Sequence, residues 1–110
     1  MNVQLLEDIG LTKPQAAAYQ ALVRKGASSA PYIAHEIGES RSNTYKVLDK
    51  LSELGLATKD QTGKKVLYYT ASPVALEQFV QKQTEQINLR ERKLKAAMPD
   101  LMNFFFAHSE

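Results

Sequence analysis

The stretch from Ser40 to Gly55, SRSNTYKVLDKLSELG, decides how the rest of this chain is interpreted. Side chains suited to a core recur at steps of three and four residues and so share one helix face: Thr44, Val47, Leu48, Leu51 and Leu54. Ser40 is suited to cap the first turn, and Gly55 can take the left-handed conformation that ends a helix. The opposite face carries Arg41, Ser42, Asn43, Lys46 and Lys50. Such side chains hydrogen-bond base edges and phosphates, so residues 41–54 form either a DNA-recognition helix or an ordinary solvated amphipathic helix.

The segments before this stretch favour the DNA-recognition interpretation. We predict helices at residues 2–9, at 12–25 with a capping box over 12–15, and from Ser29 onward. In the second helix, the side chains expected to face inward are Ala17, Ala18, Ala21 and Leu22. Residues 38–40 then make a short turn that contains a glycine. Two helices joined in this way form a helix-turn-helix.

After Gly55 the pattern changes from helix to strand. Residues 56–59 and 65–70 are rich in β-formers, and the polar segment 60–64 between them contains the glycine that a hairpin needs. A hairpin directly after a recognition helix is a wing. Its lysines, Lys59, Lys64 and Lys65, either reach phosphates or the minor groove, or only keep the sheet edge soluble.

A long helix is predicted after the wing, with Ser72 as its N-cap and Pro73 at the first helical position. Apolar residues follow a heptad pattern that Gln83 and Arg90 interrupt, and Pro99 is expected to break or kink the helix. We predict that two copies of the chain pair along this helix. The predicted dimer contacts are Leu76, Val80, Ile87, Leu94, Leu101, Phe104 and Phe105. The alternative is that the helix folds back onto itself or onto residues 2–9 of its own chain.

Composition narrows the classes of function. The chain has 110 residues, 44% of them hydrophobic, and a net charge of +2. It has no cysteine, and its two histidines lie in no metal-ligand or nucleophile motif, so we expect no catalytic residue, no metal and no cofactor. No apolar stretch approaches the length of a membrane span, which makes a cytoplasmic protein without membrane contact the default expectation. Between residues 40 and 65 there are six basic residues against three acidic ones, a modest excess that suits a phosphate-facing surface.

Taken together, the stretches LTKPQAAAYQALVRKG, IAHEIGESRSNTYKVLDKLSELGL and VLYYTASPVALEQF resemble the N-terminal domain of the TrmB-like transcriptional regulators, relatives of the MarR-type winged helices. The resemblance extends over nearly the whole chain. It implies a dimeric DNA-binding regulator from an archaeal or bacterial cell. Many members of that family also carry a large sugar-binding effector domain, which these residues do not include, so sugar sensing is not carried over and an effector stays unknown.

The sequence therefore predicts a mainly α (α+β) fold. Residues 1–72 would form a winged helix-turn-helix with a two-stranded wing, and residues 73–110 a coiled-coil-like dimerisation helix kinked near Pro99. The leading function is sequence-specific binding of double-stranded DNA by a homodimer, with the helix 41–54 in the major groove and the wing 59–65 on the backbone or in the minor groove.

The residues expected at DNA fall into two groups. The candidates for contacts at or near the bases are Arg41, Ser42, Asn43 and Lys46. The candidates for contacts with the backbone are Ser29, Tyr45, Lys50, Lys59, Lys64 and Lys65. Tyr45 has packing beside Leu48 as its alternative role, and Ser29 has simple helix capping. The alternative function for the whole chain is a protein–protein module without DNA binding, which the low net charge and the phenylalanines at 104–106 also suit.

Overall fold

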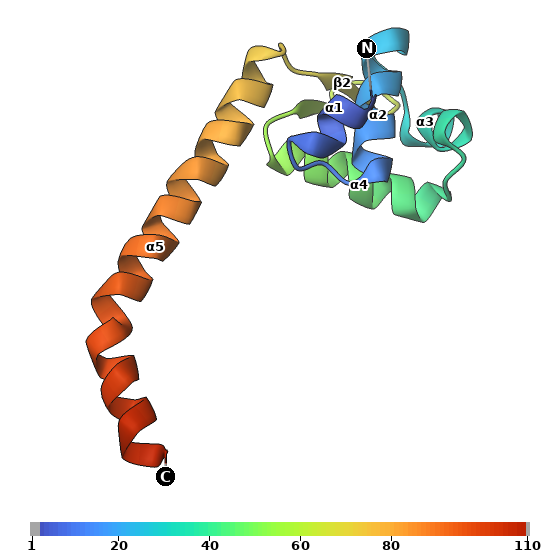
Figure 1. Cartoon of the computed structure of the whole chain (residues 1–110). Coiled ribbons are helices and arrows are strands. Elements are labelled where there is room, and N and C mark those ends of the chain that lie inside the picture. The colour runs from blue at the N-terminus through green and yellow to red at the C-terminus, as the bar shows by residue number, and fades with distance from the viewer. Residues whose placement is uncertain (1–2, 110) are drawn as a thin grey trace. The chain divides into compact units, whose positions relative to one another are not determined.

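The computed structural model describes residues 3–109 and contains five helices and one two-stranded sheet (Figure 1). In chain order the elements are α1 (Val3–Asp8), α2 (Lys13–Lys25), α3 (Ala30–Ile37), α4 (Arg41–Glu53), β1 (Ala57–Asp60), β2 (Leu67–Thr70) and α5 (Val74–His108). The chain divides into an N-terminal unit that ends at Val80 and a C-terminal unit that begins at Gln81. This order of elements confirms the predicted winged helix-turn-helix followed by a long helix.

The helices begin where their capping residues predict. At α2 the Gln15 amide donates to Thr12 Oγ1 over 3.3 Å, and the Thr12 amide donates to Gln15 Oε1 over 3.0 Å, which completes the capping box. Ser29 Oγ accepts from the Tyr32 amide at α3, and Ser40 Oγ accepts from the Asn43 amide at α4. Each cap satisfies a backbone donor that the first turn leaves without a helical acceptor.

Glycine ends the two helices of the helix-turn-helix. Gly38 caps α3 with φ of 72°, and Gly55 follows α4 with φ of 78°. A side chain is strained in this left-handed conformation, which is why glycine suits both positions. The turn between α3 and α4 therefore holds Ser40 where it caps the next helix.

A single core fills the N-terminal unit. Helices α1 to α4 and the sheet all contribute buried residues to it, with Leu6, Leu22, Ile33, Leu48, Leu51, Leu56 and Tyr68 among the largest. The predicted inner face of α4 is confirmed, because Thr44, Val47, Leu48 and Leu51 are buried. One prediction for α2 is wrong: Ala17 is only partly buried, whereas Ala16 and Tyr19 are buried. Ala16 follows the capping box by one residue and lies on the side of Tyr19, so the inner face of α2 is rotated from the one predicted.

The wing is an antiparallel hairpin, as predicted, but its strands are displaced by one or two residues. Ala57 pairs with Thr70 at one end, and Asp60 pairs with Leu67 at the other. The pairing stops there because the Asp60 carboxylate accepts from both the amide and the hydroxyl of Thr62, at 2.9 and 2.7 Å, which turns the chain into the loop. Strand β2 therefore begins at Leu67 and not at Lys65.

Helix α5 begins one residue later than predicted and is longer. Ser72 Oγ accepts from the Val74 amide, which places Pro73 just before the helix. The helix continues through Pro99 to His108, so the predicted break is wrong. Pro99 removes one helical hydrogen bond, but good helix formers on both sides of it supply the remaining bonds. A kink at Pro99 and the division at residues 72 and 73 stay predictions.

The two ends of α5 have different surroundings. Ala75, Leu76 and Phe79 in its first turns pack against the core of the N-terminal unit. No residue of this helix is fully buried. The folding of the helix back onto itself is not observed, since α5 is one uninterrupted element. Within the described residues, no helix has the combination of length and hydrophobicity that crossing a membrane requires.

Candidate nucleic-acid interface

Helix α4 turns its apolar face inward and its polar face outward. Thr44 is fully buried, and its hydroxyl donates to the Ser40 carbonyl over 2.8 Å, so this polar side chain is satisfied within the helix. Arg41, Ser42 and Lys46 are exposed. Among residues 3–109, neither Arg41 nor Lys46 forms a side-chain hydrogen bond or a salt bridge. Two cationic side chains on the first half of α4 are thus available to an external anion or base.

The other candidates for base contacts have neighbours within the protein. The side-chain nitrogen of Asn43, Nδ2, donates to Glu39 Oε2 over 2.7 Å, which leaves the side-chain oxygen of Asn43 as an acceptor. Ser42 Oγ lies 3.5 Å from the capping hydroxyl of Ser40. These contacts orient both side chains along the first turn of the helix.

The following turns of α4 carry Tyr45 and Lys50, two candidates for phosphate contacts. Tyr45 is 41% exposed, so it does not pack fully beside Leu48 and leaves part of its ring at the surface. Lys50 lies 3.5 Å from Glu53, and both side chains are largely exposed. An exposed pair of this kind contributes little to stability, so Lys50 can exchange Glu53 for a phosphate at small cost.

The three wing lysines are not equivalent. Lys64 and Lys65 are exposed at the loop side of the hairpin. Lys59 instead lies 3.5 Å from Asp49 of α4, and its ammonium nitrogen is 5.8 Å from the centre of the Tyr68 ring. The charge of Lys59 is therefore already shared with groups of the protein.

Two adjacent depressions join the elements that carry these candidates. Ser29, Pro31, Tyr45, Lys65 and Val66 line one of them, so α3, α4 and the wing meet there. The other has a volume of about 330 Å³ and is lined by Lys25, Ala27, Ser28, Ser29, Tyr32, Lys65 and Leu67. Ser29 and Lys65 belong to both. The structure thus brings together Ser29, Tyr45 and Lys65, which lie far apart in the sequence.

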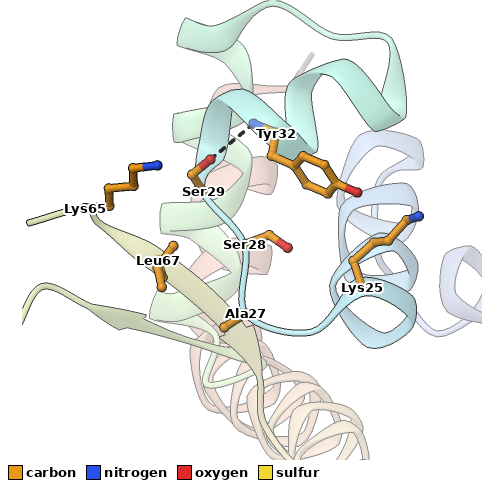
Figure 2. A pocket seen from close by; sticks show the side chains of 7 residues that line it. All are labelled: Lys25, Ala27, Ser28, Ser29, Tyr32, Lys65 and Leu67. Atoms are coloured by element: carbon orange, nitrogen blue, oxygen red, sulfur yellow. Dashed lines mark hydrogen bonds between the residues drawn. The ribbon is translucent and has the colours of Figure 1, made fainter. Parts of the chain in front are cut away.

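Figure 2 shows the second depression, with Lys25 and Lys65 on opposite sides of Ser28 and Ser29. Sequence reasoning did not select Lys25 or Tyr32. No local pattern marks them, because they lie near Lys65 through contacts between distant segments, among them the pairing of Ser28 with Tyr68. The arrangement of two cations, a helix N-terminus and a tyrosine suits an anionic group.

Tyr68 connects the wing to α4. Its side chain is fully buried, and its hydroxyl donates to Asp49 Oδ1 over 2.8 Å. Burial raises the pKa of Tyr68 strongly, and the hydrogen bond to the Asp49 carboxylate raises it further. Burial also raises the pKa of Tyr19 in the core. The Tyr68 hydroxyl therefore keeps its proton and remains a donor at any physiological pH.

The predicted dimer contacts divide into two groups. Six are exposed on α5: Val80, Ile87, Leu94, Leu101, Phe104 and Phe105. The seventh, Leu76, packs against the core of its own chain, so an intramolecular contact already accounts for it. Among residues 3–109 there is no group of His, Asp or Glu side chains suited to hold a metal ion.

Comparison with known proteins assigns the chain to a family. The profile of the family described as the sugar-specific transcriptional regulator TrmB matches residues 6–74. Among solved structures, the chain is similar to TrmBL2, an archaeal chromatin protein whose structure shows a novel mode of DNA binding. The TM-score is 0.80 at 30% identity, over 98% of this chain and 41% of TrmBL2. The chain thus corresponds to less than half the length of that protein.

More distant structures share the fold. A MarR family transcriptional regulator from Silicibacter pomeroyi has a TM-score of 0.58 at 17% identity, over 97% of this chain and 78% of its own. The ST1889 protein from the thermoacidophilic archaeon Sulfolobus tokodaii has a TM-score of 0.65 at 19% identity, over 83% of this chain and 99% of its own. No curated protein was found to match the sequence.

The family profile spans more than half of the chain, and the fold and the order of its elements agree with it. The family that it identifies is described as one of transcriptional regulators. The chain belongs to the TrmB family of transcriptional regulators and has their winged-helix DNA-binding fold.

Proposed function

We propose that this chain binds double-stranded DNA in a sequence-specific manner as a homodimeric transcriptional regulator. Helix α4 enters the major groove, and the wing lies on the backbone or in the minor groove. The observation that carries the proposal is the outer face of α4, where the cations of Arg41 and Lys46 are exposed and unpaired within the described residues. In a homodimer the two half-sites have centres about 10 bp apart, or a multiple of that spacing.

Base contacts fall to the first half of α4. Arg41 and Lys46 are donors of the kind that read guanine O6 and N7, and the free oxygen of Asn43 is an acceptor suited to an exocyclic amine. Ser42 lies between Arg41 and Asn43 and can pair with either kind of group. Because a bidentate contact contributes about 1–3 kcal/mol of discrimination, Arg41 is the residue with the most to contribute to specificity.

Backbone contacts surround this helix. Ser29, Tyr45 and Lys65 line one depression beside α4, and Lys50 and Lys64 are exposed. Lys25 and Tyr32 line the adjacent depression and extend the same surface. A phosphate over Ser29 would meet the N-terminus of α3 and the ammonium group of Lys65. Lys59 contributes less, because Asp49 already holds it.

The homodimer is supported by the exposed apolar side chains along α5. Leu94, Leu101 and Phe104 are each about half exposed or more, and a helix with such a stripe gains stability by packing against another helix. The same observation supports the second candidate function, a protein–protein module, since Phe104 to Phe106 would suit a foreign partner as well.

The test is binding to duplex DNA across a salt series. We compare the native chain with Arg41→Ala/Lys46→Ala and with the control Lys13→Ala/Arg24→Ala, which removes the same charges from exposed positions on α2. The α4 variant should lose at least tenfold in affinity for a selected site and most of its preference over random duplex, while the control keeps that preference.

Three other results would change the proposal. Tight, steeply salt-dependent binding with equal affinity for all duplexes would point to a DNA-coating protein in place of a site-specific regulator. No binding at low salt would favour the protein–protein module. A monomeric native chain that still selects a site would remove the homodimer.

A further inference from the structure

We infer that Tyr68 is a positioning residue for DNA binding: it fixes the wing and the start of α3 to the recognition helix. The inference rests on the proposed function, because it concerns the same surface. It goes beyond that function in assigning a role to a residue whose side chain is fully buried.

The side chain of Tyr68 makes the connection to the recognition helix. Its hydroxyl donates to Asp49 Oδ1 over 2.8 Å, and the ring is buried in the core. Asp49 lies on α4 between Leu48, which is buried, and Lys50, which is exposed. A buried tyrosine whose hydroxyl has a partner is fixed in one orientation, so strand β2 is held at one position along α4.

The backbone of Tyr68 makes the connection to α3. Its amide donates to the Ser28 carbonyl over 2.8 Å, and the Ser28 amide donates to the Tyr68 carbonyl over 2.9 Å. Ser28 directly precedes Ser29, the cap of α3. This pairing is what sets Lys65 of the wing opposite Ser29 across the two depressions.

The opposite strand is attached to the same carboxylate. Lys59 pairs with Tyr68 across the hairpin, and its ammonium nitrogen lies 3.5 Å from Asp49 Oδ1. Asp49 thus holds one residue from each strand of the wing. The ion pair is partly exposed and contributes little by itself, so the hydroxyl of Tyr68 is the main attachment.

Loss of the hydroxyl should act on the wing and not on the bases. Without it, the hairpin is held to α4 by packing and the Lys59 pair alone, and Lys64 and Lys65 sample a wider range of positions. Ordering them on phosphates then costs entropy, which weakens the wing contacts. The contacts of Arg41 and Lys46 come from α4 itself and should persist.

The experiment compares Tyr68→Phe with Tyr69→Phe, the same change at the next residue of β2, where the side chain is exposed. Affinity for duplex DNA is measured across a salt series, alone and combined with Lys64→Ala/Lys65→Ala. Tyr68→Phe should weaken binding about threefold to tenfold and lower the salt slope by about one or two phosphates. The lysine substitutions should then lower the affinity for DNA by a smaller factor in the Tyr68→Phe background than in the native one. Tyr69→Phe should behave as native.

A second pair of variants tests the same bond from the other side. Asp49→Ala and Asp49→Asn remove the same charge, but only Asn keeps an oxygen that accepts from Tyr68. Asp49→Ala should therefore show the shallower salt slope of the two. In the absence of DNA, amide hydrogen exchange in β1 and β2 should be faster in Asp49→Ala than in Asp49→Asn, and faster in Tyr68→Phe than in Tyr69→Phe. The exchange rates in α2 should be the same in all four variants.

The outcomes separate the two proposals. The Tyr68→Phe variant could melt at lower temperature but keep the native salt slope, and the lysine substitutions could lower its affinity by as large a factor as in the native chain. That result would make Tyr68 merely structural and overturn the inference. Unchanged exchange in the wing would overturn it without any DNA. Failure of the native chain to bind duplex DNA would instead remove the proposed function, whatever the exchange measurement gives.

Discussion

The N-terminal unit buries its large apolar side chains within one chain, whereas the C-terminal unit leaves them exposed. In the N-terminal unit, residues from four helices and a hairpin enclose one core, and Leu48, Leu51 and Tyr68 have no exposed surface. In the C-terminal unit, Ile87, Leu94 and Phe104 lie on a single helix and are more than half exposed. The first unit has the contacts it needs for stability within one chain, whereas the second has only those of an isolated helix.

The stabilities of the two units should therefore depend on different variables. The stability of the N-terminal unit depends on its own packing and should not depend on protein concentration. The order of the C-terminal unit depends on what covers its apolar side chains, and in the proposed homodimer it depends on protein concentration. All five tyrosines lie between Tyr19 and Tyr69, so tyrosine fluorescence reports the N-terminal unit alone.

A substitution in the core of the N-terminal unit should change stability the most. Leu48→Ala removes a side chain with no exposed surface and should lower the free energy of unfolding by about 2–5 kcal/mol. Urea unfolding followed by tyrosine fluorescence measures it. Leu5→Ala is the control, because Leu5 is 58% exposed and its loss should change stability by less than about 0.5 kcal/mol. Equal losses in both variants would contradict the core as described.

The next effect concerns the C-terminal unit. Leu94→Ala should leave tyrosine-detected unfolding unchanged at low concentration but weaken self-association at least tenfold, because burying a leucine contributes about 1.5–3 kcal/mol. Sedimentation equilibrium measures the association. Leu89→Ala provides the comparison, since Leu89 is also exposed but lies off the heptad positions of Ile87 and Leu94. A loss of association in both variants would show that the heptad seam is not the interface.

A smaller effect is expected at the start of α4. Ser40→Ala removes the acceptor of the Asn43 amide, now 3.1 Å away, and should cost about 1 kcal/mol of stability in the N-terminal unit. Ser42→Ala, two residues further on and exposed, should be close to neutral in the same thermal unfolding experiment. If both are neutral, capping by Ser40 does not limit the stability of this unit.

The smallest effect is a titration at the tip of the wing. The amide of Thr62 and, to a lesser degree, its hydroxyl donate to Asp60 and hold the pKa of that carboxyl below its ordinary value. Because the folded pKa is lowered, this contribution to stability is complete above the ordinary pKa and is lost as the pH falls through the folded value. Carboxyl NMR titration should show the low pKa in the native chain and a partial return in Thr62→Val. A native value at or above the ordinary one would contradict the loop geometry.

The sequence predicts best what is local. Caps at Thr12, Ser29 and Ser40 and the inner face of α4 depend on residues three or four positions apart, and all of them are confirmed. The strands of the wing differ from the prediction by one or two residues, because a run of β-formers does not show where the turn at Asp60 stops the pairing. The break at Pro99 was wrong because one missing hydrogen bond does not end a helix that is otherwise well formed.

What could not be predicted depends on contacts between distant segments. Lys25 and Tyr32 lie beside Lys65 and Ser29 through contacts between distant segments, among them the pairing of Ser28 with Tyr68. In the same way, the sequence does not distinguish Lys59 from the other wing lysines, and only the structure shows it beside Asp49 of α4. No periodicity connects such residues. The base and phosphate assignments themselves stay predictions until DNA binding is measured.

The pairing of Ser28 with Tyr68 also sets an order for folding. It closes a loop that contains α3, α4 and β1, and the entropy of closing such a loop is recovered only when the helices inside it are packed. A two-stranded hairpin is marginal by itself, so the wing should take its final form late. During synthesis, α4 is complete once Gly55 has left the ribosome, but the domain around it cannot close until Tyr68 has followed. A newly made chain therefore acquires its helix-turn-helix before it acquires the surface proposed to hold DNA.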